Sequence, residues 1–213
     1  MLNCDGSAPG KGQLEDLTPL RGLRLASLSF SYTQVSDLSP LRGMRLTELG
    51  CHGTRVSDLA PLEGMRLRAL GLTDTQVADL APLRGMHLWG LDLCGARRVS
   101  DLRPLEGMPL TYLNLGHLPV SDLSVLASLK SLGHLVLVDM PVRDLTPLRG
   151  LPLDRLGIEG IKVTDLTPLK GMPLSHLVLD YRSEYEKILR SFTSLTEINR
   201  KPAPQFWMEM KGE

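Results

Sequence analysis

Leucines and valines recur along the chain with a period of 21 or 22 residues. A segment of the form V/L-x-D-L begins at Leu14, Val35, Val56, Val77, Val99, Val120, Val142 and Val163. Each copy runs into an alternating stretch of the form L-x-x-L-x-L, such as "LRALGL" at 67–72. Alternation places Leu70 and Leu72 on one side of a strand and the residues between them on the other. Since one such strand cannot bury its leucines alone, the pattern predicts strands stacked on a continuous leucine core.

The segment before each strand predicts the return path of the repeat. In "VSDLAPLEGM" at 56–65, Val56 and Leu59 are expected in the core. Asp58 is placed to accept hydrogen bonds from backbone N–H groups of the turn. Pro61 fixes the start of a 3₁₀ or short helical turn, and Gly64 ends it. The aspartate recurs in all eight copies, which argues for turn formation, because catalytic carboxylates need two different environments.

This pattern resembles the leucine-rich repeat, in the 21 to 22 residue class of internalin-type and SDS22-like proteins. The resemblance covers essentially the whole chain. It implies a right-handed horseshoe, an α/β solenoid with short parallel concave strands, convex 3₁₀ or short helical turns and a helical C-terminal cap. The recurring motif "DLxPLxGMPL" and the C-terminal segment 188–207 further resemble C-terminal repeat arrays of planctomycete-type bacterial proteins, which are often attached to Ser/Thr kinase domains.

The chain departs from that family after each strand, where the family carries asparagine. Here the positions hold Thr33, Thr54, Thr75, Ala96 and Ile161. Threonine can bond a backbone group in the bend, though less fully than asparagine. The copy at Val120 also departs, with Val125 and Ser128 in place of the proline and glycine.

Three parts are predicted: a partial first repeat with a flexible loop at 1–13, the repeats at 14–181 and a cap at 182–213. "LNC" at 2–4 matches the second half of a strand, so we infer that Met1 begins a fragment. In the cap, Ser183 and Glu186 suggest a capping box. The apolar positions that predict a helix closing the core are Tyr185, Ile188, Leu189 and Phe192. One last strand is expected at 195–199, with Phe206 and Trp207 as a further lid.

Charge changes this picture little. Lysine plus arginine number 24, as do aspartate plus glutamate, so no global field draws the chain to nucleic acid or a membrane. The arginines of the early turns form a basic strip interrupted by Glu63: Arg21, Arg24, Arg42, Arg45, Arg66 and Arg84. Cys4 and Cys51 lie two repeats apart, about 10 Å and beyond disulfide reach. A reducing, cytoplasmic location is therefore expected.

The histidines and motifs offer little chemistry. His134 and His176 share a concave column but are separated by Arg155, about 10 Å apart and too far to share one metal ion. They could form an anion-attracting ladder opposite Glu159 and Asp180, or be ordinary solvated side chains. The sequence contains no phosphate-binding loop, nucleophile elbow or HExxH motif. We therefore expect no cofactor, no metal and no enzymatic activity.

The concave positions can vary without harming the core. Small residues in the strands between 48 and 94 predict a shallow floor, with Trp89 at its lip. Because Trp, Tyr and Arg most often carry interface binding energy, a partner site is predicted at Arg68, Trp89, Asp92, Tyr112, Asn114 and His134. The alternative is that Trp89 merely covers the edge of the core.

The expected function is a non-catalytic module that binds a protein or peptide, as one arm of a larger bacterial signalling protein. The alternative is a structural spacer or self-associating array. In either case a monomer, or a weak dimer through the uncapped N-terminal repeat, is expected.

Overall fold

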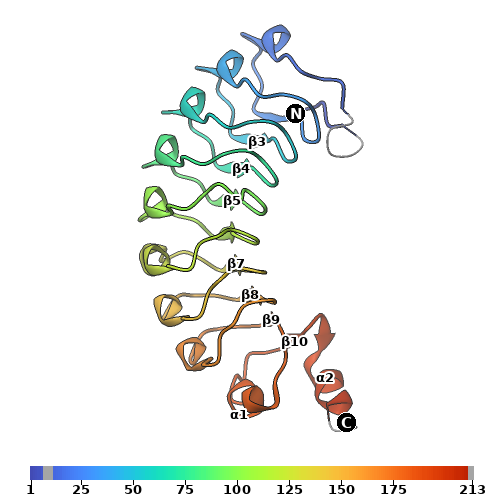
Figure 1. Cartoon of the computed structure of the whole chain (residues 1–213), viewed down its shortest axis with the longest axis vertical. Helices are drawn as coiled ribbons and strands as arrows, with labels where there is room; N and C mark the ends of the chain where they lie inside the picture. The colour runs from blue at the N-terminus through green and yellow to red at the C-terminus, as the bar shows by residue number, and fades with distance from the viewer. Residues whose placement is uncertain (7–11, 211–213) are drawn as a thin grey trace.

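The computed structural model describes residues 1–6 and 12–210. They form one eleven-stranded sheet whose strands follow chain order, and the whole chain bends into an arc (Figure 1). Strands β1 to β10 are parallel, and β11 turns back antiparallel to β10. The strands are β1 (Leu2–Asn3), β2 (Ser27–Ser29), β3 (Glu48–Gly50), β4 (Ala69–Gly71), β5 (Gly90–Asp92), β6 (Tyr112–Asn114), β7 (His134–Val136), β8 (Arg155–Ile158), β9 (His176–Leu179), β10 (Glu197–Ile198) and β11 (Lys201–Pro202).

The predicted leucine core is confirmed. The central leucines of consecutive strands pair directly, as Leu49 does with Leu70 and Leu70 with Leu91. Each of these three side chains is at most 2% exposed. Such stacking buries apolar surface continuously from strand to strand, which is what stabilises a repeat that has no core of its own. We call one strand with the turn that precedes it a rung.

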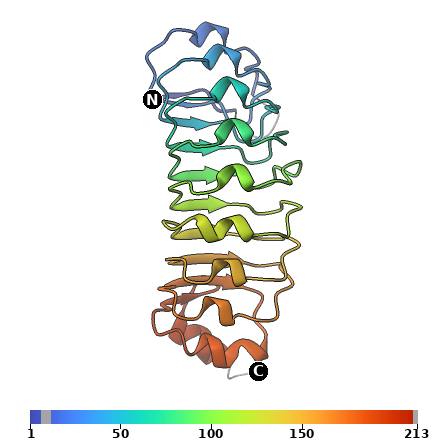
Figure 2. The same cartoon turned by 90° about the vertical axis from the view of Figure 1, so that its left-hand side faces the viewer.

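The predicted turns are also confirmed, and they line the convex side of the arc (Figure 2). Short 3₁₀ helices span Thr18–Leu20, Ser39–Leu41, Ala60–Leu62, Ala81–Leu83, Arg103–Leu105, Ser124–Ser128, Thr146–Leu148 and Thr167–Leu169. Before each one, the aspartate accepts a hydrogen bond from the backbone N–H two residues on, as Ala60 donates to Asp58 over 2.8 Å. Gly64 then adopts φ +73°, a left-handed conformation that other residues avoid.

The rung at Val120 shows what the missing proline and glycine change. Its 3₁₀ helix, Ser124–Ser128, is five residues long where its neighbours have three. The Ser128 hydroxyl donates to the Val125 carbonyl (2.7 Å) and accepts from the Gly107 N–H of the preceding rung (2.9 Å). A side chain thus anchors the turn here, where the other rungs use glycine.

The bend after each early strand is held by threonine. Thr33, Thr54 and Thr75 are buried, and each hydroxyl donates to the carbonyl three residues back, over 2.6–2.7 Å. The prediction that threonine bonds a backbone group in the bend is confirmed.

The C-terminal end is closed by α1 (Glu186–Leu189) and α2 (Ala203–Glu209). Tyr185, Leu189 and Phe206 are buried against the last rungs. The predicted capping box is wrong. A 3₁₀ turn begins at Ser183 itself, so Arg182 occupies the cap position and no side chain caps the helix.

At the other end β1 continues the sheet, with Leu2 opposite Leu28 and Asn3 opposite Ser29. The loop predicted within 1–13 falls mostly outside the described residues. No helix in residues 1–6 and 12–210 is long and apolar enough to cross a membrane.

Candidate functional site

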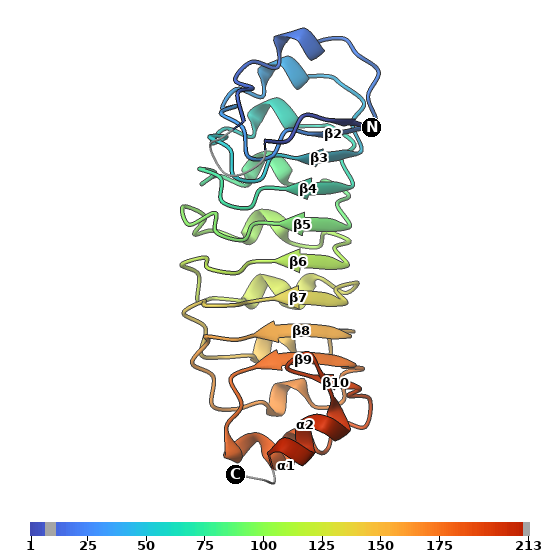
Figure 3. The same ribbon diagram turned by 90° about the vertical axis from the view of Figure 1, so that its right-hand side faces the viewer.

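A hollow of about 430 Å³ lies on the concave face across β2 to β6, the strands that face the viewer in Figure 3. Its floor is made by the backbone of Gly50, Gly71 and Gly90 and by the small side chain of Ala69. Neighbouring strands therefore lack large outward side chains at two positions: Ala69 pairs with Gly90 at one, and Gly50 pairs with Gly71 at the other. A Cβ atom at Gly90 would meet no atom closer than the Cβ of Ala69, at 4.0 Å. The hollow exists because small residues occupy these positions.

Trp89 forms one wall of the hollow. It directly precedes β5, and its side chain is large, apolar and 48% exposed. Its backbone is fixed on both sides, since its N–H donates to the Arg68 carbonyl (2.8 Å) and its carbonyl accepts from the Thr111 N–H (2.8 Å). The ring also lines a second hollow on the flank of the solenoid, with Arg68, Arg84 and His87. Trp89 therefore separates two depressions.

Asp92 and Tyr112 line the same hollow. Gly90 pairs with Tyr112 across β5 and β6, and the Tyr112 hydroxyl lies 3.5 Å from a carboxylate oxygen of Asp92. The other Asp92 oxygen accepts from the Cys94 N–H (3.0 Å). Burial, reinforced by the negative charge of Asp92, raises the pKa of Tyr112. The phenol therefore stays neutral and serves as a hydrogen-bonding and apolar wall.

The remaining predicted site residues, Asn114, His134 and Arg68, do not line this hollow. Asn114 accepts a hydrogen bond from the Gly116 N–H (3.1 Å) and lies one strand beyond Asp92. His134 packs edge to face against Tyr112, with ring centroids 5.0 Å apart. Burial, and then the positive charge of Arg155, lower the pKa of His134, so its imidazole is neutral at pH 7. Arg68 lines the flank hollow instead, on the other side of Trp89.

The hollow also extends further toward the N-terminus than the six predicted residues. Glu48, His52 and the serines of β2 line it as well. The imidazole of His52 covers Gly71, and its Nδ1 accepts from the Thr73 N–H (3.2 Å). The concave register could have indicated Glu48 and His52, because both alternate with buried residues. Their convergence on the hollow depends on rotamers that a repeat pattern does not specify.

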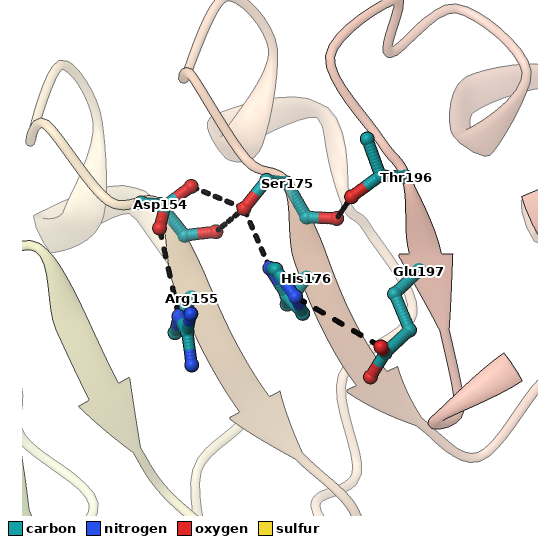
Figure 4. A network of polar contacts seen from close by, with 6 residues as sticks. All are labelled: Asp154, Arg155, Ser175, His176, Thr196 and Glu197. Atoms are coloured by element: carbon teal, nitrogen blue, oxygen red, sulfur yellow. Dashed lines mark hydrogen bonds and ion pairs between the residues drawn. The ribbon is translucent and has the colours of Figure 1, made fainter. Parts of the chain in front are cut away.

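A polar network lies at the other end of the concave face (Figure 4). The Ser175 hydroxyl lies 2.6 Å from Nδ1 of His176, and Nε2 of His176 lies 3.9 Å from a Glu197 oxygen. Ser175 also hydrogen-bonds Asp154, whose other oxygen lies 3.6 Å from Nε of Arg155.

The order serine, histidine, glutamate invites comparison with a hydrolytic triad. The geometry argues against it. A hydroxyl has one proton, and the Asp154 carboxylate is a stronger acceptor than a neutral imidazole. Ser175 therefore donates to Asp154, and His176 is not placed to activate it as a nucleophile. Asp154 also offsets the positive charge of Arg155, and Glu197 adds a negative charge beside His176, which weakens the interpretation of this column as an anion-attracting ladder. The network connects neighbouring rungs.

Metal and redox chemistry find little support in the described residues. Cys4, Cys51 and Cys94 are free thiols, and burial raises the pKa of Cys51 to about 12, so it stays protonated. His134 and His176 lie in β7 and β9 with β8 between them. In residues 1–6 and 12–210, no three His, Cys, Asp or Glu side chains gather as metal ligands would.

Comparison with solved structures identifies proteins of similar fold. A structure of an internalin from Listeria monocytogenes superposes with a TM-score of 0.73 at 28% identity, over 80% of this chain. An internalin C2 from the same organism gives a TM-score of 0.74 at 28% identity, over 81% of this chain and 79% of that one. The chain spans about half, 52%, of the length of the first internalin structure. No protein-family model and no curated protein sequence matches.

The stacked parallel strands, the 3₁₀ turns and these structural neighbours lead to one conclusion: the chain folds as a leucine-rich-repeat solenoid with an internalin-like structure.

Proposed function

We propose that this chain is a non-catalytic module that binds a protein or peptide through its concave face. One observation carries the proposal: the hollow floored by Gly50, Gly71 and Gly90 and walled by Trp89 and Tyr112. It leaves a large indole half exposed on a rigid sheet. Aromatic anchors beside a preformed depression are where interface energy concentrates, since the anchors lose little conformational entropy on binding.

Membership of a larger bacterial signalling protein is a further proposal, which rests only on the resemblance of the "DLxPLxGMPL" segments and of the C-terminal segment 188–207. A cytoplasmic location stays a prediction, for which the three free thiols are the supporting observation.

The test fills the hollow without touching the core. Immobilised protein would be used to select peptides from a random phage-displayed library, and the enriched peptides would be synthesised and titrated. Gly90→Val places a side chain into open space and suits a strand. We expect it to weaken peptide binding at least about tenfold, because the valine side chain would occupy the space in which the peptide contacts Trp89 and Tyr112. Trp89→Ala should do the same.

Gly157→Val is the matched control. Gly157 lies in β8, outside the hollow, and a Cβ there would make only ordinary contacts of 3.7 Å and more. Thermal unfolding would verify that all variants fold. Peptides whose affinity is unchanged by Gly90→Val and Trp89→Ala, or lost equally in Gly157→Val, would contradict the proposal, as would a library that yields no binder.

Self-association through the N-terminal rung is a second candidate, favoured by exposure of its apolar side chains. Leu23 is 45% exposed, while Met44 at the same position of the next rung is 9% exposed. Leu25 is only partly buried, whereas Leu46 is completely buried. Sedimentation velocity over a range of concentrations should show a dimer that Leu23→Glu abolishes. Met208→Glu, at an equally apolar exposed position of the C-terminal cap, is the control. A concentration-independent monomer would exclude this candidate.

A further inference from the structure

A row of arginines follows the flank of the solenoid between the convex turns and the concave strands. Six of them occupy two positions of the rungs of β2 to β5, in the segments "LRGLRL", "LRGMRL", "LEGMRL" and "LRGMHL", and Arg68 directly follows the third segment. We call these residues the arginine flank: Arg21, Arg24, Arg42, Arg45, Arg66, Arg68 and Arg84. All seven are exposed. In the later rungs the position of Arg45 is taken by Pro109, Ser131, Pro152 and Pro173. At this position the positive charge is therefore confined to the first half of the molecule, whereas the Arg21 position is cationic again in later rungs, as Arg149 and Lys170.

These cations are not neutralised within the fold. In the part of the chain that the structure describes, none of the seven arginines takes part in a salt bridge. Asp16 and Asp37, the carboxylates that feel the charge of Arg21, already accept hydrogen bonds from the N–H groups of their own turns. Glu63 adds one negative charge within the row. A net positive surface remains, although the chain as a whole carries no net charge.

Three hollows follow one another along this flank, one between each pair of neighbouring rungs. Their volumes are about 520, 490 and 620 Å³ from the N-terminal side. Each combines arginines with a methionine or leucine: Met44 lines the first two, and Met65 the second and third. A partner that fits these hollows must therefore supply both negative charges and apolar side chains.

The repeat of the flank matches the repeat of an α-helix. Parallel strands are about 4.8 Å apart. Because the strands lie on the inner side of the arc and the turns on the outer side, neighbouring rungs are closer together at the strands than at the turns (Figure 1). One turn of α-helix rises about 5.4 Å and brings residues three or four apart onto one face. A helix lying along the solenoid axis thus presents one side chain per turn to each successive rung.

We propose that the arginine flank binds an acidic amphipathic α-helix of a partner protein, with one carboxylate per turn facing Arg24, Arg45 and Arg66 and apolar side chains in the hollows. This surface adjoins the concave hollow, with which it shares Trp89. Single-stranded nucleic acid fits this surface less well, because proteins that bind it stack successive bases on several aromatic rings. The one indole that lines the three described hollows is Trp89, at the far end of the row.

The experiment uses a fluorescein-labelled helical peptide of about 15 residues, or four turns, with glutamate once per turn and leucine beside it. Fluorescence anisotropy should show binding that weakens at least about tenfold when NaCl rises from about 50 to about 300 mM. A peptide with glutamine in place of glutamate should not bind. Each exposed arginine should contribute up to about fivefold, so Arg45→Ser with Arg66→Ser should weaken binding by about tenfold or more.

Arg143→Ser, an exposed arginine on a later convex loop, is the matched control and should leave binding unchanged. Serine stands at the Arg45 position naturally in the rung of β7, so these variants should fold, and thermal unfolding would verify it. A peptide that scatters its glutamates around the helix tests the spacing and should bind several-fold more weakly. Equal affinity for the scattered peptide, tighter binding of an oligothymidine of equal charge, or full binding by the double variant would each overturn the proposal.

Discussion

The rungs of β2 to β5 and those of β6 to β9 differ at the bend that follows each strand, except that the rung of β5 already has the apolar bend of the second set. In the first set Thr33, Thr54 and Thr75 are buried, and their hydroxyls bond backbone carbonyls. From β5 onward the same position holds apolar side chains, all buried: Ala96, Leu118, Met140 and Ile161. Both solutions satisfy the rule that a buried position is either apolar or hydrogen-bonded. The bend tolerates either chemistry as long as no polar atom is left unpaired.

The two sets differ more on their surfaces than in their interiors. The first carries the arginine flank and a concave floor of glycine and alanine; the second carries prolines on the flank and a floor that includes Val136, Val138 and Val178. Their leucine columns are equally buried. The comparison separates positions held by packing, which repeat, from positions free to vary, which change in blocks of several rungs.

Truncating the core should have the largest effect and should not distinguish the two sets. Leu70 in β4 and Leu156 in β8 are each 2% exposed at the same register. Leu70→Ala and Leu156→Ala should each lower the free energy of unfolding by about 2–5 kcal/mol, through lost burial and the cavity left behind. Urea denaturation followed by circular dichroism measures this. If the losses of unfolding free energy in the two variants differ by more than about 2 kcal/mol, the two halves of the core are not equivalent.

Removing a bend hydroxyl should affect the first set only. Thr54→Val keeps the shape but leaves the Cys51 carbonyl without the 2.7 Å hydrogen bond it now accepts. The free energy of unfolding should fall by about 1–2 kcal/mol. Ile161→Val, at the same position of the second set, loses one methylene and no hydrogen bond, and should cost about 0.5–1.5 kcal/mol. An unchanged stability for Thr54→Val would mean that the hydroxyl does not hold the bend.

The repeating positions were predictable from the sequence, because each one repeats a local rule. The aspartate that accepts a turn N–H, the glycine at φ +73° and the alternating leucines each follow from a few neighbouring residues. The capping box failed because the turn begins one residue earlier than Ser183 would need as a cap. Tyr185 in this turn is buried, and its hydroxyl donates to the Val163 carbonyl, contacts that no local motif encodes.

The candidate site was predictable only in part. Trp89, Asp92 and Tyr112 do share one hollow, because the concave register places them on neighbouring strands. Arg68 lies behind the Trp89 ring in the flank hollow. Which side a long side chain takes depends on its rotamer and on the curvature of the solenoid, and the repeat pattern contains neither.

Acid should weaken both sets alike through the turn aspartates. Hydrogen bonds from Ser39 lower the pKa of Asp37, and those from Thr167 lower the pKa of Asp165. A carboxyl whose pKa is lowered by folding stabilises the protein above its unfolded pKa of about 3.9, and loses that contribution as pH falls through the folded value. The thermal midpoint should therefore decline below about pH 4.

Asp37→Asn and Asp165→Asn test this point in the two sets. Each variant should unfold at a slightly lower temperature than the parent chain at neutral pH, because the neutral amide accepts a weaker hydrogen bond than the carboxylate. The difference should shrink toward about pH 2, where the parent carboxyl is also neutral. Differential scanning calorimetry across this range measures it. A difference that is constant with pH would assign the effect to shape and not to charge.

The smallest expected effect comes from moving a flank residue of the second set into the first. The Arg45 position is proline in the rungs of β6, β8 and β9, and within the described residues the Arg45 N–H donates no backbone hydrogen bond. Arg45→Pro should thus be compatible with the fold and raise the free energy of unfolding by about 0.4–1 kcal/mol, since proline restricts the unfolded chain. Arg45→Ser separates this from the loss of charge and should stay within about 0.5 kcal/mol of the parent chain. Urea denaturation of both variants measures the difference. If Arg45→Pro instead destabilises the chain while Arg45→Ser does not, the backbone at this position differs between the two sets. The fold would then exclude proline from the first set, and the arginines there would not indicate selection for binding a partner.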